Sequence, residues 1–127
     1  MSKNKVSIIG SGGHCRPLLE VLNECKRNYL KEIYDLSYSK KIKETILNNK
    51  VVGSFENYLK KNKKETYLAI GNNEKRKKIY NLLKKKNILL PNLISKTSTN
   101  SKHLTLGDAN FINKKAFLGT SVKLGNN

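Results

Sequence analysis

The order of apolar and polar residues at the start of the chain predicts a strand, a helix and a second strand. Residues 5–9 (KVSII) form a compact apolar run that predicts a strand. Residues 29–34 (YLKEIY) predict a second strand, which is followed by Asp35. Between them, the apolar residues of segment 13–27 recur at three- and four-residue spacings, which indicates a helix with one buried face. Pro17 falls in the first turn of this helix, where a missing N–H costs little.

The alternation continues after a polar interval. Segment 36–49 is rich in lysine and predicts a surface excursion, and residues 51–53 predict a very short strand. Ser54 is expected to cap a short helix, FENYLKK, in which Asn57 stands where a capping box has Glu or Gln. Residues 66–70 (TYLAI) then predict a third clear strand, which the sequence GNN interrupts.

A lysine-rich helix and a last apolar run complete this part of the chain. Segment 74–86 has its apolar residues on one face and closes at Asn87, a residue that tolerates the left-handed cap conformation. Segment 88–94 (ILLPNLI) contains Pro91, which suits an edge strand or an irregular exit. Because strands alternate with helices, we expect residues 1–93 to form an α/β domain with right-handed βαβ units and a small, Rossmann-like parallel sheet.

After residue 93 the pattern changes to a six-residue repeat. Residues 94–127 divide into ISKTST, NSKHLT, LGDANF, INKKAF, LGTSVK and LGNN. The repeat predicts a parallel β-helix, in which every sixth residue turns inward and the glycine after it relieves crowding at a corner. The inward positions are Ile94, Asn100, Leu106, Ile112, Leu118 and Leu124. Segment 94–127 therefore reads as the start of such a β-helix, with fewer than two full coils.

The content of basic residues bears on whether the chain binds nucleic acid. The chain has 127 residues, a formal charge of +17 and 26 basic residues, but only Arg16, Arg27 and Arg76 are arginine, the residue that grips bases and phosphates bidentately. The lysines are scattered among asparagines, which is typical of solvated helix faces. We therefore expect no specific nucleic-acid partner.

No apolar segment approaches the ~18–20 residues of a membrane span, and the N-terminal apolar run is too short for a signal sequence. A cytoplasmic protein without membrane insertion is expected. Cys15 and Cys25 are too far apart on one helix for a disulfide, and no second cysteine pair completes a metal site. Both are expected to be reduced structural thiols.

The stretch VSIIGSGGH, residues 6–14, is the candidate for ligand chemistry. A glycine-rich turn between a strand and a helix lets backbone N–H groups approach a phosphate, although a plain tight turn has the same composition. A dinucleotide site is a second alternative, since Gly10 and Gly12 match the first two glycines of G-x-G-x-x-G and Asp35 stands near the position of a ribose partner. Cys15 occupies the third glycine position, however, and the sheet is short, which favours a mononucleotide-type ligand.

Four stretches together, GSGGH, AIGNNEKRKKIY, PNLI and the hexapeptides, resemble the bacterial sialic-acid O-acetyltransferases and UDP-4-amino-sugar N-acetyltransferases, which are hexapeptide-repeat sugar acyltransferases. The resemblance covers essentially the whole chain as the N-terminal portion of such an enzyme. It implies a left-handed β-helix after the α/β domain. It also implies a cytoplasmic acetyl-CoA-dependent acetyltransferase of glycan biosynthesis.

The resemblance further implies that three loops hold a nucleotide-activated amino sugar or sialic-acid-type sugar. The first loop would contact sugar and pyrophosphate, the second would lie near uridine or cytidine, and the third would close the pocket. In that order, the implied residues are Gly12, Gly13 and His14; Asp35 and Leu36; and Ile70, Gly71 and Asn72. Ser11 is a further candidate, and Arg76 is either a phosphate or carboxylate contact or only a surface charge.

In the resembled family, full-length chains form homotrimers, acetyl-CoA lies between adjacent β-helices, and a histidine beside an acidic residue is the catalytic base. This chain contains only His14 and His103, and His103 does not match that motif. No catalytic residue is therefore expected here, and the pair is expected beyond Asn127, as in a truncated acyltransferase with most of its acetyl-CoA site absent. A non-catalytic Rossmann-like module for a nucleotide or dinucleotide is the alternative function, and a basic nucleic-acid-binding protein is a third.

Overall fold

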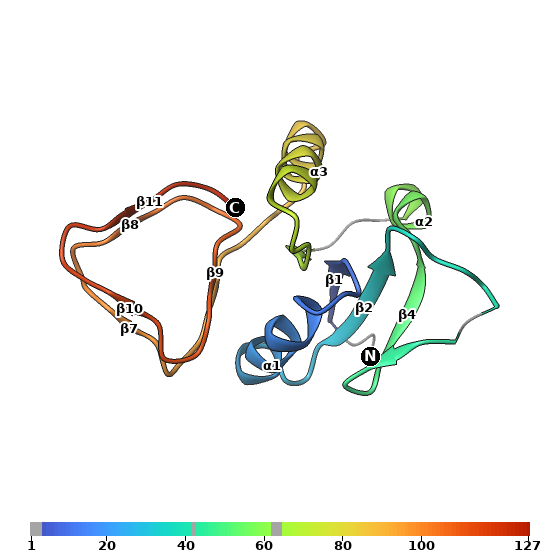
Figure 1. Cartoon of the computed structure of the whole chain (residues 1–127), viewed down its shortest axis with the longest axis horizontal. Coiled ribbons are helices and arrows are strands. Elements are labelled where there is room, and N and C mark those ends of the chain that lie inside the picture. Colours follow the sequence, from blue (N-terminus) through green and yellow to red (C-terminus); the bar gives the residue numbers. More distant parts are fainter. Residues whose placement is uncertain (1–3, 42, 62–64) are drawn as a thin grey trace.

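The structure is a computed structural model of the whole chain, and it describes residues 4–41, 43–61 and 65–127. A five-stranded sheet with strand order β3-β4-β2-β1-β5 forms the first part of the molecule (Figure 1). Four strands run parallel, and β3 pairs antiparallel with β4. The strands are β1 (Lys5–Ile9), β2 (Leu30–Asp35), β3 (Thr45–Ile46), β4 (Asn49–Ser54) and β5 (Thr66–Leu68). The predicted α/β class with a parallel sheet is confirmed.

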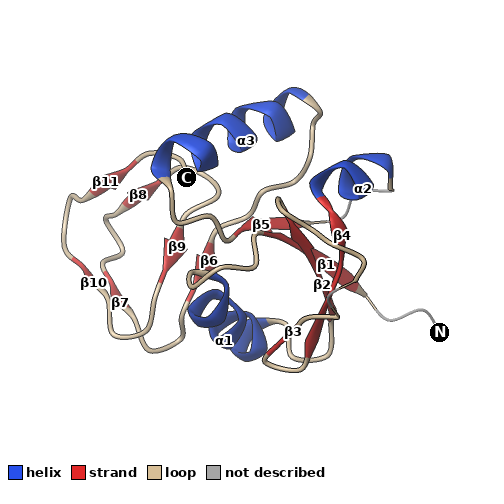
Figure 2. Ribbon diagram, turned by 45° about the vertical axis from the view of Figure 1, so that its right-hand side comes forward, coloured by secondary structure: helices blue, strands red, loops and turns tan. Residues whose placement is uncertain are grey.

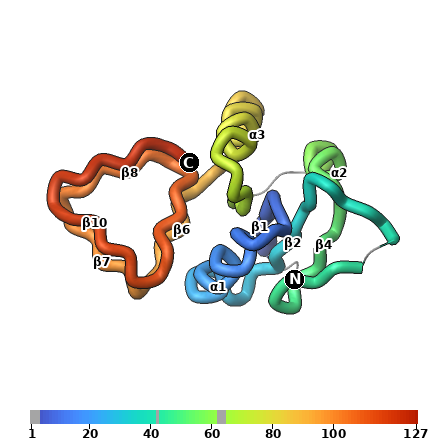
Figure 3. Tube along the Cα trace, in the orientation of Figure 1, coloured from blue at the N-terminus to red at the C-terminus, as the bar shows by residue number. Residues whose placement is uncertain are grey.

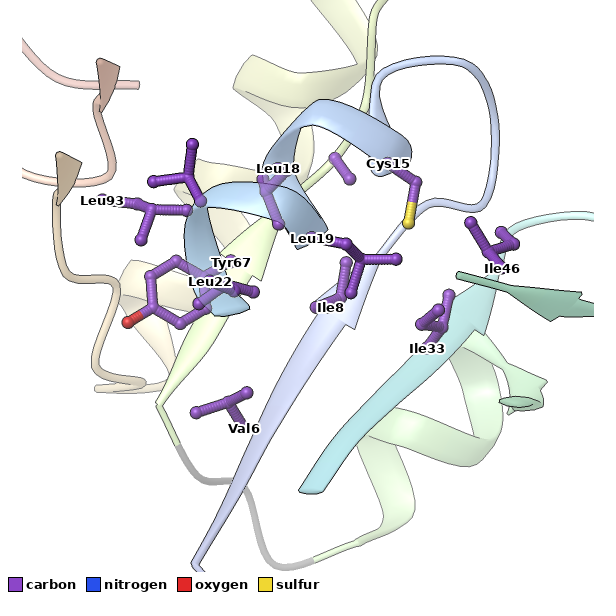
Figure 4. Packing of buried hydrophobic residues seen from close by; sticks show 12 residues of the cluster. Val6, Ile8, Cys15, Leu18, Leu19, Leu22, Ile33, Ile46, Tyr67 and Leu93 are labelled. Carbon is purple, nitrogen blue, oxygen red and sulfur yellow. The ribbon is translucent and has the colours of Figure 1, made fainter. Parts of the chain in front are cut away.

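Helix α1 (Cys15–Cys25) covers one face of the sheet. Leu18, Leu19 and Leu22 of the helix pack with residues of β1 and β2 in a cluster whose members are almost fully buried (Figure 4). This is the arrangement that the three- and four-residue spacing predicts, because one stripe of the helix meets one side of the strands. The helix is shorter than predicted and begins at Cys15, directly after the glycine loop.

Helices α2 (Phe55–Lys60) and α3 (Asn73–Lys85) pack on the opposite face. Adjacent residues of a strand point to opposite sides, so Ile8 contributes to the core beneath α1 while Ile9 joins the second core with Tyr58 of α2 and Leu83 of α3. Figure 2 shows α1 on one side of the sheet and the other two helices on the far side.

The predicted cap of α2 is present. The hydroxyl of Ser54 accepts from the backbone N of Asn57 at 3.1 Å, and Oδ1 of Asn57 accepts from the backbone N of Ser54 at 2.9 Å. Asparagine therefore completes the reciprocal pair that Glu or Gln usually makes.

Three boundaries differ from the prediction. The lysine-rich segment 36–49 contains β3, which turns into β4 through Leu47 and Asn48, both with positive φ. The strand predicted at 66–70 ends at Leu68. Segment 88–94 forms no strand of the large sheet; it is the irregular exit, and its last two residues belong to the second part of the molecule.

The second part consists of short strands wound into a coil with three sides (Figure 3). Each strand pairs in parallel with the strand one full turn later: Ile94 lies beside Ile112, Asn100 beside Leu118, and Leu106 beside Leu124. A turn therefore spans three hexapeptides, and every predicted inward position is the second residue of a strand. The strands are β6 (Leu93–Ile94), β7 (Thr99–Asn100), β8 (Thr105–Leu106), β9 (Phe111–Ile112), β10 (Phe117–Leu118) and β11 (Lys123–Leu124).

The corner chemistry differs from the expectation. The left-handed conformation falls on Ala109, Lys115 and Ser121, the fourth residue of successive repeats, rather than on the glycine in second place. Among the corner glycines, a Cβ is blocked only at Gly107, where it would lie 2.5 Å from the carbonyl oxygen of Gly125. The glycine that follows the inward residue is therefore not what turns the chain.

Polar contacts tie the coil to both faces of the α/β sheet. On α1, Glu24 accepts from the hydroxyl of Ser95 at 3.1 Å, and Glu20 pairs with Lys114 at 3.1 Å. On α3, Tyr80 and Lys84 donate to the two oxygens of Asp108, each at 2.5 Å. The coil is thus held by a helix on each side of the sheet.

Candidate functional site

The predicted site residues follow three neighbouring strands at the point where each strand ends. Ile9 of β1 is in register with Tyr34 of β2 and with Leu68 of β5, so the loops after these strands begin side by side. The strands are parallel, and ligands of open α/β sheets bind outside such carboxyl ends. The structure therefore brings the three predicted loops to one edge of the sheet.

Gly10 is required by the fold rather than by a ligand. Its φ is +109°, and a Cβ at this position would lie 2.8 Å from the carbonyl carbon of Ala69, in the loop after β5. No other residue type accepts both the positive φ and this contact. Gly10 thus locks the first loop against the third.

Gly12, Gly13 and Gly71 are different, because a Cβ at any of them would meet no heavy atom within 4 Å and none has the positive φ of Gly10. Gly12, Gly13 and Gly71 are exposed, whereas Ser11 is half-buried. The missing side chains leave open space at the edge of the sheet, where another molecule can approach the backbone closely.

His14 lies at the start of α1 without capping it. Its ring is half-buried and meets the ring of Phe111 edge-on, with centroids 5.6 Å apart and planes at 87°. Burial, and then the positive charge of Arg76, lower the pKa of His14 below its usual value of 6.5. The imidazole is therefore neutral at pH 7, so one of its nitrogens donates a hydrogen bond and the other accepts one.

Arg76 is more than a solvated surface charge. Its guanidinium donates to the carbonyl oxygen of Ile70 at 2.9 Å and to Oδ1 of Asn73 at 3.0 Å. It therefore ties the start of α3 to the loop after β5, and its positive charge acts on His14 across the glycine loop. Whether Arg76 also contacts a phosphate or carboxylate stays a prediction.

The remaining predicted residues have defined local roles. Asn72 caps α3 by accepting from the backbone N of Lys75 at 2.9 Å, and Ile70 is buried in the second core. Asp35 accepts from the backbone N of Ser37 at 2.9 Å, which shapes the turn after β2. Leu36, beside it, is exposed.

Phe111 is the site residue that the sequence did not indicate. It belongs to the coil, yet its ring packs on His14 and on the core beneath α1. The hexapeptide pattern places residue 111 just before an inward position, but nothing in that pattern relates it to the glycine loop. Only the docking of the coil brings the two rings together.

Cys15 and His103 do not belong to the group of site residues at the carboxyl ends of the strands. The Cys15 side chain is fully buried among Ile8, Ile33 and Ile46, and burial raises the pKa of its thiol to about 12 (Figure 4). His103 is exposed on the coil. Cys25 has its Sγ 3.5 Å from the carbonyl oxygen of Ile94, and both cysteines are free.

Within the described ranges, no group of three His, Cys, Asp or Glu side chains could hold a metal ion. Over the same part of the chain, none of the helices has the length and apolar character needed to cross a membrane.

Comparison with known proteins relates the chain to one family and to solved acetyltransferase structures. The family model of the PglD N-terminal domain matches residues 5–83. No match is found among curated proteins.

Three solved structures illustrate the shared fold. PerB from Caulobacter crescentus, in complex with CoA and GDP-perosamine, has a TM-score of 0.83 at 23% identity over 98% of this chain and 58% of that chain. The acetyltransferase domain of PglB from Neisseria gonorrhoeae, in complex with acetyl coenzyme A, has a TM-score of 0.81 at 24% identity over 98% of this chain and 60% of that chain. A mutant of perosamine N-acetyltransferase from Caulobacter crescentus, in complex with CoA and GDP-perosamine, has a TM-score of 0.81 at 22% identity over 96% and 57%.

The chain spans about three fifths of the length of these structures. The matches confirm the predicted relationship to the N-terminal portion of the sugar acyltransferases, and they confirm the fold of sheet domain followed by coils.

Proposed function

Because the chain belongs to the family of the PglD N-terminal domain, we propose that its three edge loops bind a nucleotide-activated amino sugar or sialic-acid-type sugar. The ligand class comes from the resemblance, and two of the solved structures with a similar fold are complexes with GDP-perosamine. Those structures are under 25% identical to this chain, so the support for the proposal comes from the three edge loops.

The open glycines are the observation that carries the proposal. Gly12, Gly13 and Gly71 lack a side chain where the fold does not require its absence. A diphosphate is the ligand group that uses such positions, since its oxygens bind backbone N–H groups at close range. The first turn of α1 and the fixed guanidinium of Arg76 add positive potential at the same edge.

The neutral His14 suits the sugar end of this ligand. A neutral imidazole can accept from a sugar hydroxyl or amine at one nitrogen and donate at the other. Asp35, the last residue of β2, and Leu36, which follows it, are assigned to the nucleoside, with Ile70 and Asn72 beside Gly71 after β5 on the opposite side. The candidate nucleosides are uridine, cytidine and guanosine, and the titration below distinguishes them.

For the whole protein we propose acetyl transfer from acetyl-CoA to an amino group or hydroxyl of the bound sugar. The sugar nitrogen or oxygen forms a bond to the acetyl carbonyl carbon, the C–S bond of the thioester breaks, and a base passes the proton of the nucleophile to the departing CoA thiolate. The catalytic histidine–acid pair is expected outside residues 1–127, and assembly into a homotrimer through the coil belongs to the same proposal. His14 is a ligand contact in this scheme and not the base.

Isothermal titration of the folded chain with UDP-, GDP- and CMP-linked sugars tests the binding proposal. We expect one class to bind, and Gly12→Val to weaken it about ten-fold or more, because a side chain there separates phosphate from the backbone donors. Gly125→Val is the matched control, since Gly125 also faces open space but lies on the coil. Absence of heat with all three classes, or equal loss in both variants, would contradict the proposal.

The alternative function is a non-catalytic module that binds a dinucleotide. The burial of Cys15 speaks against it, because the third glycine of the dinucleotide fingerprint permits close packing of helix on strand, and here a full side chain fills that place. Titration with NADH, followed by its fluorescence, separates the two functions. Tight NADH binding without binding of any nucleotide sugar would favour the module.

A further inference from the structure

Helix α3 carries a concentration of positive charge of which the edge site uses only Arg76. Its sequence, NEKRKKIYNLLKK, has six basic residues and one acidic residue, Glu74. Helix α1, on the other face of the sheet, has one basic residue and two acidic residues. The charge of the helices that cover the two faces of the sheet is therefore uneven, with the excess of lysine on α3.

The packing of α3 decides which of these residues face outward. Leu83 is buried and Ile79 and Tyr80 are half-buried against the second core, which fixes the inner side of the helix. The other side is exposed, and Figure 2 shows α3 along the outside of the molecule with no element over it. Lys75, Lys78, Leu82 and Lys85 follow one another at three- and four-residue spacings and so form one outer stripe.

Two apolar side chains accompany the lysines. Leu82 is 36% exposed within the stripe, and Leu89, just after the helix, is 64% exposed. Lys86 caps the end of the helix between them. We call the six residues Lys75, Lys78, Leu82, Lys85, Lys86 and Leu89 the basic face.

Among the described residues, no carboxylate of the chain forms an ion pair with a lysine of the basic face. In the described part of the chain, the one α3 lysine paired with a carboxylate is Lys84, which binds Asp108 and is not part of the face. Arg76 points inward to the carbonyl oxygen of Ile70. The lysines of the basic face are thus available to an outside anion.

We propose that the basic face docks on the surface of a bilayer that contains anionic lipid. Lysines attract such a surface, each adding roughly five-fold to the partition coefficient, and exposed leucines enter the boundary between head groups and acyl chains. A helix of 13 residues is about 20 Å long, so the outer stripe of Lys75, Lys78, Leu82 and Lys85 can contact a membrane along its whole length. The contact is peripheral and weakens with salt.

The same charge would also attract nucleic acid, but the composition of the face favours lipid. Single-stranded nucleic acid is bound with aromatic stacking, and the one aromatic residue of α3, Tyr80, is half-buried and donates to Asp108. Arginine, which reads bases and phosphates bidentately, is absent from the basic face. Exposed leucines serve no purpose against a phosphate backbone.

Co-sedimentation of the 127-residue chain with vesicles tests this proposal. The vesicles are phosphatidylcholine with one third phosphatidylglycerol, and pure phosphatidylcholine vesicles serve as the uncharged control. One variant changes Lys75, Lys78, Lys85 and Lys86 to Gln. The matched variant changes four exposed coil lysines, Lys96, Lys102, Lys115 and Lys123, to Gln and so has the same net charge. A third variant is Leu89→Ser.

We expect binding to the anionic vesicles only, a loss of about ten-fold or more in the α3 variant, and at most a two-fold loss in the coil variant. Leu89→Ser should bind more weakly at the same salt slope, since it removes apolar burial and no charge. Equal losses in the two lysine variants would show attraction by net charge alone and overturn the proposal. Tighter binding to duplex DNA than to the vesicles, with the same loss in the α3 variant, would assign the face to nucleic acid instead.

Discussion

At the residue scale, the glycines of the edge divide by what surrounds them. Gly10 has a positive φ and faces the carbonyl of Ala69, so the fold excludes a side chain there. Gly12 and Gly13 have open space on the same side of the chain, so the fold permits one. The sequence alone shows three glycines and a serine in residues 10–13, with nothing to distinguish the glycines. The different roles of Gly10 and of Gly12 and Gly13 depend on the neighbouring loop after β5.

Because of this difference, we expect the same substitution to change the stability of the fold strongly at Gly10 and very little at Gly12. Gly10→Ala should lower the free energy of unfolding by about 2–4 kcal/mol, because it adds backbone strain and a contact with the loop after β5. Gly12→Ala should change it by less than about 0.5 kcal/mol. Urea unfolding of both variants measures the two values. A similar loss in both would mean that the loops are not locked through Gly10.

His14 also owes its properties to a residue distant in the chain. Phe111 covers part of its ring, and burial is the larger of the two effects that lower the pKa of His14. Phe111→Ala should therefore raise this pKa toward the usual 6.5, because the protonated imidazole regains solvent. An NMR titration of the His14 ring protons measures the shift.

Phe117→Ala is the control for that measurement. Phe117 is also on the coil but is 75% exposed, and it should leave the pKa of His14 unchanged. A pKa of His14 that stays the same in the Phe111 variant would show that the coil does not shape the site.

At the scale of elements, the join between α3 and the coil depends on one carboxylate. Tyr80 and Lys84 of the helix both donate to Asp108, and the backbone N of Asp108 donates to Oδ1 of Asn126 at 2.9 Å. Burial alone would raise the pKa of Asp108, but the hydrogen bonds from Lys84 and Tyr80 outweigh it and lower the pKa below its usual value. Burial, and then the hydrogen bond and charge of Asp108, raise the pKa of Tyr80 to about 12.

The sign of this shift predicts a pH dependence. A carboxyl with a depressed pKa in the folded state contributes stability above its unfolded pKa of about 3.9, and the contribution is lost as the pH falls through the folded value. Asp108→Asn should cost about 1 kcal/mol between pH 5 and 8, and the cost should shrink below about pH 4. Urea unfolding as a function of pH measures the difference from the wild type.

Asp35→Asn is a suitable control, since Asp35 accepts from the nearby backbone N of Ser37 and does not bridge elements. If the cost of Asp108→Asn were independent of pH down to pH 3, the ion pair with Lys84 would not stabilise the fold.

At the scale of the whole molecule, the coil is part of the site because two helices hold it in place. Glu20 and Glu24 of α1 bind it on one side, and the pair of donors on α3 binds it on the other. The glycine loop is at the start of α1, so its position relative to Phe111 is set by the same helix. The two faces of the sheet also differ in charge, with acidic side chains of α1 turned to the coil and lysines of α3 turned outward.

Local patterns in the sequence predict helices α1, α2 and α3, strands β1, β2, β4 and β5, the parallel sheet and the period of the coil, but they do not predict β3. These features follow from local patterns: apolar runs that end in glycine, a helical spacing with one buried face, and a hexapeptide repeat that puts each inward residue in a strand. The Ser54 cap of α2 and the left-handed backbone conformation of Asn87 can also be predicted from the sequence, since both depend on a few neighbouring residues. The candidate loops were found for the same reason, because each directly follows a strand.

Features that depend on contacts between residues distant in the chain are visible only in the folded molecule. The structure assigned Leu93 to the coil rather than to the α/β domain, placed the turn of the coil on Ala109 and Lys115, and set Phe111 against His14. It also separated the glycine that the fold needs from those that a ligand would use. Contacts of this kind arise from packing and docking between elements, and no periodicity along one segment records which distant residue it will meet.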